Sequence, residues 1–137
     1  MRVLIVEDNV LLARVLTEAL TEAGHEVIGP ASSSGEAIQL AENEDPQIAL
    51  VDLDLERWSI GLDVAEELTA ELDIDVIICT ATPELARRGS SGAIGLISKP
   101  YDLRDVVKSL SIVQAFPSEN QPSPLLPPSF ELLVSPQ

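Results

Sequence analysis

The first 116 residues alternate between short apolar runs and amphipathic stretches, which limits the possible folds more than any other feature of this chain. The apolar runs cover residues 3–6, 27–28, 48–51, 76–79 and 93–97. Short apolar runs that are bounded by polar residues are typical of strands with both faces covered. Between the runs, apolar residues recur three and four positions apart, which predicts helices, including a short one over residues 83–88.

Strands that alternate with helices favour right-handed crossovers and a parallel sheet. Five such strands predict a doubly wound, flavodoxin-like α/β fold whose parallel sheet has the order 2-1-3-4-5, with helices on both faces. The shortest run, Val27-Ile28, is predicted to be an edge strand that ends at Gly29-Pro30. Ligands of such sheets bind beyond the carboxyl ends of the strands, so we expect the functional residues there.

The composition changes after residue 116. Residues 117–137 contain six of the ten prolines and only two charged side chains. We interpret this segment as an irregular, Pro-rich C-terminal tail rather than a separate domain, which leaves residues 1–116 as one domain. The tail also carries apolar residues, such as Phe130, that could dock on this domain, on a second copy of the chain or on a partner. The alternative is that the tail is a disordered terminus.

The charge balance excludes several kinds of partner. Eight Lys and Arg residues against 23 Asp and Glu residues give a formal net charge of −15. Phosphate backbones and anionic membrane surfaces are bound mostly by clustered cationic side chains, so we expect neither a nucleic-acid nor a membrane partner. The single Cys excludes an intramolecular disulfide, which fits a cytoplasmic protein.

Chemically reactive residues stand at the ends of four predicted strands. Glu7 and Asp8 follow the first strand, Asp52 ends the third, Thr80 ends the fourth, and Lys99 stands just beyond the fifth. The predicted topology brings these residues to one rim of the sheet. Carboxylates that are packed together repel each other unless a cation lies among them, and ligand sets made of oxygen atoms favour Mg²⁺.

This set of residues suits the acceptance of a phosphoryl group. A carboxylate can attack a phosphoryl donor when the negative charge that gathers there is neutralised. Asp52 would attack, Lys99 and Mg²⁺ would neutralise the charge, and the hydroxyl group of Thr80 would donate a hydrogen bond to a phosphoryl oxygen.

Four segments of the chain resemble the receiver domain of two-component response regulators. They are LIVEDN (4–9), ALVDLDL (49–55), CTA (79–81) and ISKPYD (97–102). The resemblance covers about residues 1–115 and implies a flavodoxin-like fold that is phosphorylated on Asp52 by a histidine kinase or a histidine phosphotransfer protein. It also implies Mg²⁺ held by Asp8, Asp52 and the backbone carbonyl of Asp54, with Glu7 acting through water, and a cis peptide bond before Pro100.

The chain departs from the receiver pattern at two places. Leu96 stands where family members commonly carry Tyr or Phe, and an aromatic residue, Tyr101, follows Pro100 instead. The segment from Thr80 to Lys99 is also shorter than usual, which shortens the fourth helix. These departures leave open whether phosphorylation switches the domain in the usual way.

Three functions therefore remain open. The first is a stand-alone, phosphorylation-dependent receiver that acts on an unknown downstream protein by contact or by phosphorelay, with homodimerisation as one form of contact. The second is a receiver-like binding scaffold that no longer switches, as Leu96 suggests. The third is a Mg²⁺-dependent phosphohydrolase in which Asp54 supplies a second carboxylate; Lys99-Pro100 and Glu7-Asp8 favour a receiver, which is not an enzyme in the usual sense.

Overall fold

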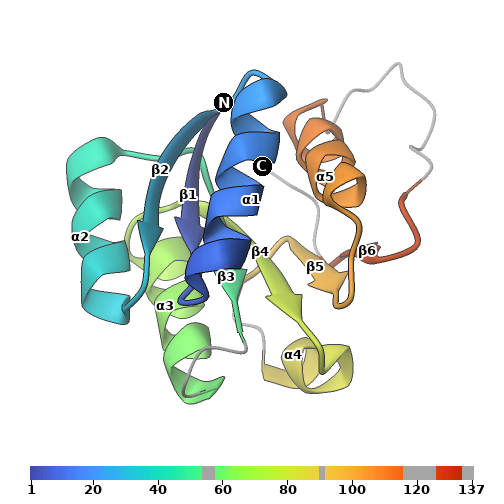
Figure 1. Ribbon diagram of the computed structural model, residues 1–137. Helices are drawn as coiled ribbons and strands as arrows, with labels where there is room; N and C mark the ends of the chain where they lie inside the picture. Colours follow the sequence, from blue (N-terminus) through green and yellow to red (C-terminus); the bar gives the residue numbers. More distant parts are fainter. Residues whose placement is uncertain (54–57, 90–91, 116–125, 134–137) are drawn as a thin grey trace.

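The computed structural model describes residues 1–53, 58–89, 92–115 and 126–133. Strands and helices alternate along the chain (Figure 1). Their bounds are β1 (Arg2–Val6), α1 (Val10–Glu22), β2 (Glu26–Ala31), α2 (Ser34–Glu44), β3 (Ile48–Asp52), α3 (Trp58–Ala70), β4 (Asp75–Thr80), α4 (Pro83–Gly89), β5 (Gly95–Ser98), α5 (Leu103–Ala115) and β6 (Phe130–Leu132). Helix α4 is the short helix that the sequence predicts over residues 83–88.

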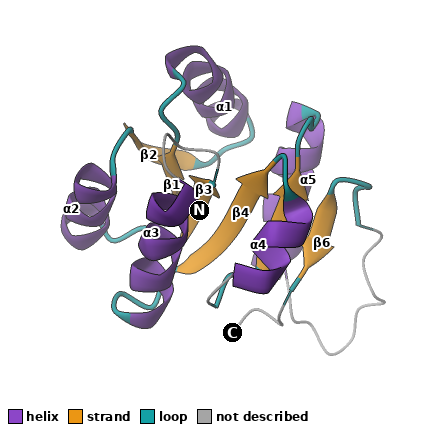
Figure 2. Cartoon of the chain, turned by 90° about the horizontal axis from the view of Figure 1, so that it is seen from below, coloured by secondary structure: helices purple, strands orange, loops and turns teal. Residues whose placement is uncertain are grey.

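The strands form one sheet in the order β2-β1-β3-β4-β5-β6. The first five strands are parallel, which confirms the predicted flavodoxin-like α/β fold and its order 2-1-3-4-5. Helices cover both faces (Figures 1 and 2). In the part of the chain that the structure describes, no helix is long and apolar enough to cross a membrane.

The side chains of each central strand alternate between two cores, as expected for a sheet that is buried on both faces. In β1, Val3 and Ile5 pack on the side of α1 and α5, whereas Leu4 and Val6 pack on the side of α2 and α3. Leu16 and Leu20 of α1 complete the first of these cores. Helix α4 contributes Ala86 to the second. The central strands are thus packed on both faces, and this packing positions the residues at their ends.

Strand β2 does not end at Gly29-Pro30, as the sequence predicted, but continues to Ala31. Gly29 has a φ of +94°, and a Cβ atom there would lie 2.8 Å from the backbone nitrogen of Ala31. The pairing with β1 shifts register at this point, which lets an edge strand accommodate Pro30. The continuation has a consequence for the site, because the carbonyl of Ala31 accepts a 2.9 Å hydrogen bond from the backbone of Glu7.

The C-terminal segment adds a sixth strand, so its interpretation as irregular throughout is wrong for Phe130–Leu132. Strand β6 pairs antiparallel with β5, and the side chain of Phe130 is only 4% exposed. Residues 130–132 therefore dock on this domain, which was one of the alternatives that the sequence left open. Residues 116–125 lie outside the described residues, and the domain boundary after residue 116 stays a prediction.

Candidate functional site

The carboxyl ends of β1, β3, β4 and β5 meet at one rim of the sheet. The strands are in register there: Val6 pairs with Val51, Asp52 with Cys79, and Thr80 with Ser98. Residues that directly follow these positions are thus brought together from distant parts of the sequence. The structure places all five predicted strand-end residues, Glu7, Asp8, Asp52, Thr80 and Lys99, at this rim.

Three carboxylates form a cluster at the rim. Oxygen atoms from Glu7, Asp8 and Asp52 all lie within 4.8 Å of one another. Glu7 and Asp52 are buried, whereas Asp8 is exposed. The backbone of Glu7 is bound to Ala31, and its side-chain oxygen Oε2 accepts a 3.1 Å hydrogen bond from the backbone of Asn9. The cluster is consequently built into the fold and is open to solvent on the side of Asp8.

Lys99 reaches the cluster from the end of β5. Its Nζ atom lies 2.8 Å from Oδ1 of Asp52 and donates a hydrogen bond to it. The backbone of Lys99 donates a 2.8 Å hydrogen bond to the carbonyl of Thr80, and the peptide bond between Lys99 and Pro100 is cis. The lysine is thereby held at both its backbone and its ammonium group, beside the carboxylate that the sequence singled out.

The pKa of the Glu7 carboxyl group is raised by its surroundings. Burial, a hydrogen bond with Asp52 and the negative charge of Asp52 raise the pKa of Glu7 from 4.5 to about 8, although Lys99 and the Asn9 backbone act in the opposite direction. Close carboxylates share protons when no further cation neutralises them. The pKa of Glu7 is therefore raised first by burial and then by the neighbouring carboxylate, and a cation bound at the cluster would oppose both effects.

These carboxylates fit a magnesium ion. They offer only oxygen ligands, one of them is exposed to water, and Mg²⁺ is bound typically by one or two carboxylates together with water molecules. Asp8 and Asp52 would hold the ion, and Glu7 would stand beside it. The backbone carbonyl of Asp54, which the resemblance adds to the ligands, lies outside the described residues.

Thr80 is fully buried at the end of β4, and its hydroxyl group is linked to the next helix. The Oγ1 atom accepts a 3.0 Å hydrogen bond from the backbone of Thr82 and lies 3.1 Å from the hydroxyl oxygen of that residue. Thr82 directly precedes α4, and its carbonyl accepts a hydrogen bond from Ala86. Sequence reasoning missed Thr82, although a second hydroxyl residue two positions after Thr80 was a readable signal.

The two positions that depart from the receiver pattern lie on opposite faces of the sheet. Leu96 is 1% exposed and packs in the core on the side of α2 and α3. Tyr101 is half-buried against the core on the side of α1 and α5, and burial raises the pKa of its hydroxyl group. Tyr101 also lines a shallow apolar hollow next to the site, together with Leu12, Ala81, Lys99 and Pro100.

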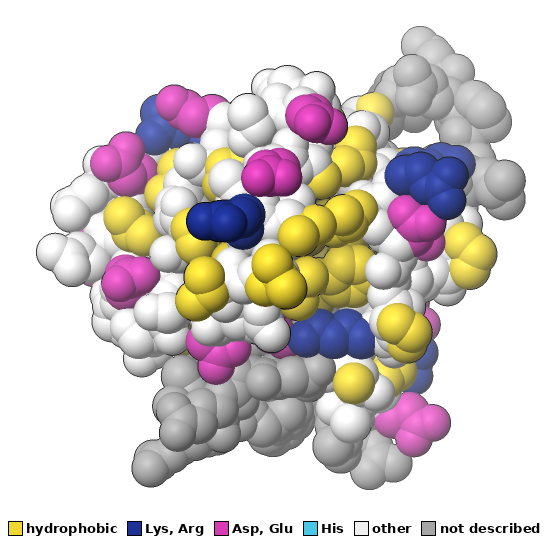
Figure 3. Space-filling model, viewed as in Figure 1, with side chains coloured by type: hydrophobic (Ala, Val, Ile, Leu, Met, Phe, Trp, Pro, Cys, Tyr) yellow, Lys and Arg dark blue, Asp and Glu magenta, His cyan; other side chains and the backbone are white. Residues whose placement is uncertain are grey.

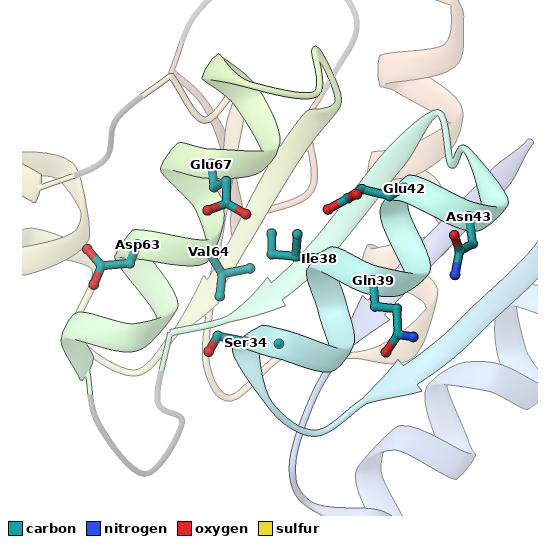
Figure 4. Close-up of a pocket in the computed structure, with 9 residues that line it drawn as sticks. Ser34, Ile38, Gln39, Glu42, Asn43, Asp63, Val64 and Glu67 are labelled. Atoms are coloured by element: carbon teal, nitrogen blue, oxygen red, sulfur yellow. The ribbon is translucent and has the colours of Figure 1, made fainter.

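A second hollow, of about 460 Å³, lies between α2 and α3, away from the strand ends (Figure 4). Ile38 and Val64 point toward each other at its floor, and the carboxylates of Glu42 and Glu67 face each other above them. Among the residues that the structure describes, its lining contains no basic side chain that would bind a phosphoryl group. The strand-end rim is therefore the candidate functional site.

Comparisons with known proteins agree with this site. The family model "Response regulator receiver domain" matches residues 3–111. The transcriptional regulatory protein PdtaR of Mycobacterium tuberculosis is 31% identical over 114 residues, which cover 81% of this chain and 55% of PdtaR. The chemotaxis protein CheY of Thermotoga maritima is 30% identical over 116 residues, which cover 82% of this chain and 96% of CheY. The chain thus spans about half the length of PdtaR and nearly all of CheY.

Solved structures extend the likeness to three dimensions. The signal receiver domain of a modulated diguanylate cyclase from Desulfovibrio desulfuricans G20 is 31% identical, with a TM-score of 0.69 over 81% of this chain and 90% of that one. The fold, the acidic cluster and the family match agree with one another, and the match covers most of the sequence. The chain belongs to the response regulator receiver domain family.

Proposed function

We propose that this chain is a cytoplasmic signalling receiver that accepts a phosphoryl group on Asp52 from a histidine kinase or a histidine phosphotransfer protein. One observation carries the proposal: Asp52 is buried at a strand end, 2.8 Å from the ammonium group of Lys99 and in one cluster with Glu7 and Asp8. A buried carboxylate in contact with both a cation and a metal-binding cluster is arranged for phosphoryl transfer rather than for stability alone.

Each side chain at the site has its own role in the proposed phosphoryl transfer. An oxygen of the Asp52 carboxylate forms a bond to phosphorus while the bond from phosphorus to the donor histidine breaks, and the histidine leaves with its electron pair. Lys99 stabilises the negative charge on the phosphoryl oxygens, and the Thr80 hydroxyl donates a hydrogen bond to one of them. Mg²⁺, when bound at Asp8 and Asp52, neutralises the carboxylates and the incoming phosphoryl group.

The phosphoryl donor has an apolar surface to dock on next to the site. Val10 and Leu11, in the first turn of α1, are 79% and 70% exposed, and they directly follow Asp8 and Asn9 in the chain. The hollow that Leu12 and Tyr101 line is adjacent to Lys99. Hydrophobic side chains gather on the face between α1 and α5 (Figure 3). Exposed apolar side chains of this kind are typical of protein interfaces, so we assign the donor protein to this face.

The output is proposed to be contact with a downstream protein or transfer of the phosphoryl group to another protein, with homodimerisation as one form of contact. A net charge of −15 opposes direct contact with nucleic acid or with an anionic membrane surface. The family match also argues against the phosphohydrolase alternative, because receiver domains are not classical enzymes.

Phosphorylation can be tested with acetyl phosphate and Mg²⁺, followed by intact mass spectrometry. The wild-type chain is expected to gain about 80 Da, the mass of one phosphoryl group, and Asp52→Asn is expected to gain none. Asp75→Asn is the matched control, because Asp75 is half-buried at the opposite end of the neighbouring strand β4. A wild-type chain that gains no mass, or a gain that survives Asp52→Asn, would contradict the proposal.

A non-switching scaffold is the second candidate function. It is favoured by Leu96, which fills the buried position where an aromatic side chain is expected and whose backbone is paired with β6. The same mass measurement separates the two candidates, because a scaffold that has lost the receiver chemistry gains no phosphoryl group on Asp52.

A further inference from the structure

The outer edge of β5 lies outside the strand-end rim and is covered by a segment of the chain itself. Residues 130–132 pair along this edge as β6, beside α4 and α5 (Figure 2). The backbone of Ser98 donates a 2.8 Å hydrogen bond to the carbonyl of Ser129, and the backbone of Leu133 donates a 2.8 Å hydrogen bond to the carbonyl of Ile94. These two bonds lie at the two ends of the pairing between β5 and β6.

The space above Gly95 in β5, called the socket below, holds an aromatic ring. Gly95 lies beneath the ring of Phe130, and a Cβ atom on Gly95 would come within 2.6 Å of that ring. Phe130 is 4% exposed and packs with Ile97 in the core on the side of α1 and α5. Glycine weakens a strand interior and is found where another group must approach the backbone closely. The phenyl ring therefore occupies the space that a larger side chain at this position would fill.

The two neighbouring helices contact the residues on either side of the ring. Arg87 of α4 forms a 2.8 Å ion pair with Glu131. Asp105 of α5 accepts a 3.1 Å hydrogen bond from the hydroxyl group of Ser129. Three consecutive residues are thus recognised by three different parts of the domain, through a hydroxyl group, an aromatic ring and a carboxylate.

The strand that covers this edge is short and is itself the last strand of the sheet. Strand β6 has three residues, and the ion pair with Arg87 is nearly half exposed on both sides, where such pairs contribute little. Short strands at the edge of a sheet, with few backbone bonds, open more readily than central strands.

We propose that the edge of β5 is a binding site for an extended peptide segment with the pattern Ser-Phe-acidic, and that the chain's own residues 129–133 occupy it until a partner protein presents such a segment. The partner adds an antiparallel strand to β5, places its aromatic ring over Gly95 and its carboxylate on Arg87. This binding does not require phosphorylation on Asp52, so the two proposals can be tested separately.

The test uses the full chain and a fluorescein-labelled peptide of residues 126–134, with binding measured by anisotropy. Phe130→Ala empties the socket, so this chain is expected to bind the peptide at least about tenfold more tightly than the wild-type chain does. A peptide with Ala in place of Phe, and a Phe130→Ala chain that also carries Gly95→Ala, are expected to lose that binding. Circular dichroism shows that each chain is folded.

A second variant covers the case in which Phe130→Ala fails to fold. Glu131→Arg places like charges together at Arg87 and weakens the internal occupant, while Phe130 stays intact. This chain is also expected to bind the peptide more tightly than wild type does. The Arg87→Glu chain should prefer a peptide in which Arg replaces the residue corresponding to Glu131.

Three outcomes would overturn the proposal. The first is equal binding to the wild-type and Phe130→Ala chains, and the second is binding that Gly95→Ala does not change. The third is a wild-type chain that forms dimers with rising concentration in light scattering and loses them in Phe130→Ala, because a second copy would then be the partner at β5.

Discussion

Glu7 has a pKa of about 8, so its charge changes close to neutral pH. The folded state binds a proton at Glu7 that the unfolded state has already released between pH 4.5 and 8. The contribution of Glu7 to stability is therefore full below about pH 4.5 and is lost as the pH rises toward 8. In buffer without Mg²⁺, we expect the free energy of unfolding to fall as the pH rises over this range.

Urea unfolding of the wild type and of Glu7→Gln at several pH values measures this effect. The amide group of Gln carries no charge at any of these pH values, so the loss of stability with rising pH should be much smaller in Glu7→Gln. Glu66→Gln, at an exposed position of α3, is the matched control and should behave as wild type does. Parallel curves for wild type and Glu7→Gln would show that Glu7 titrates normally.

Lys99 is the cation nearest to the phosphorylated atom in the proposed function. Its ammonium group donates to Oδ1 of Asp52, and on transfer it would stabilise the phosphoryl oxygens. Removing one such donor typically slows a reaction by about a hundredfold or more. Lys99→Ala is therefore expected to slow phosphorylation by acetyl phosphate by about this factor, measured as the rate of mass gain. Lys108→Ala, at an exposed position of α5, should leave the rate unchanged; equal rates for both variants would exclude this role of Lys99.

At the scale of elements, the cap of α1 connects the stability of a helix to the position of the site. Asn9 precedes the helix, and its side-chain oxygen accepts a 3.0 Å hydrogen bond from the backbone of Leu12. Asn9→Ala is expected to lower the free energy of unfolding by about 1 kcal/mol, measured by urea unfolding. Asn9→Ser keeps a capping oxygen and should lose much less. If both variants lose the same amount, the cap does not stabilise α1.

The elements around the site could be predicted because their signals are local. The apolar runs that end at Val6 and Val51 determine the strands, and parallel topology then determines that Glu7, Asp8 and Asp52 meet. The raised pKa of Glu7 could not be predicted, because it depends on burial and on the distance to Asp52, which only the folded chain sets. The same applies to the link between Thr80 and Thr82.

The errors in the predicted elements arose where tertiary contacts override local signals. Pro30 would normally end a strand, yet β2 continues because it lies at the sheet edge and shifts register beside Gly29. The prolines after residue 116 indicated an irregular segment, yet three residues form β6 because Phe130 fills the space above Gly95. A ring and a glycine that are 35 positions apart leave no periodic pattern in the sequence.

At the scale of the whole molecule, the net charge of −15 implies repulsion that salt should relieve. Sodium chloride screens this repulsion without binding at one place, so it is expected to raise the thermal unfolding temperature gradually. Mg²⁺ should act in addition at the cluster of Glu7, Asp8 and Asp52, because a ligand that binds only the folded state stabilises it. At equal ionic strength, MgCl₂ is therefore expected to stabilise the chain more than NaCl does.

Charge-removing variants separate the two contributions. Asp8→Asn removes the exposed carboxylate of the cluster and should abolish the difference between MgCl₂ and NaCl, which amounts to about 2.7 kcal/mol when Mg²⁺ is present at a hundred times its dissociation constant. Glu67→Gln removes one charge from the acidic hollow between α2 and α3 and should leave the difference intact. The opposite result, with the difference lost only in Glu67→Gln, would assign the Mg²⁺ effect to that hollow and not to the strand ends.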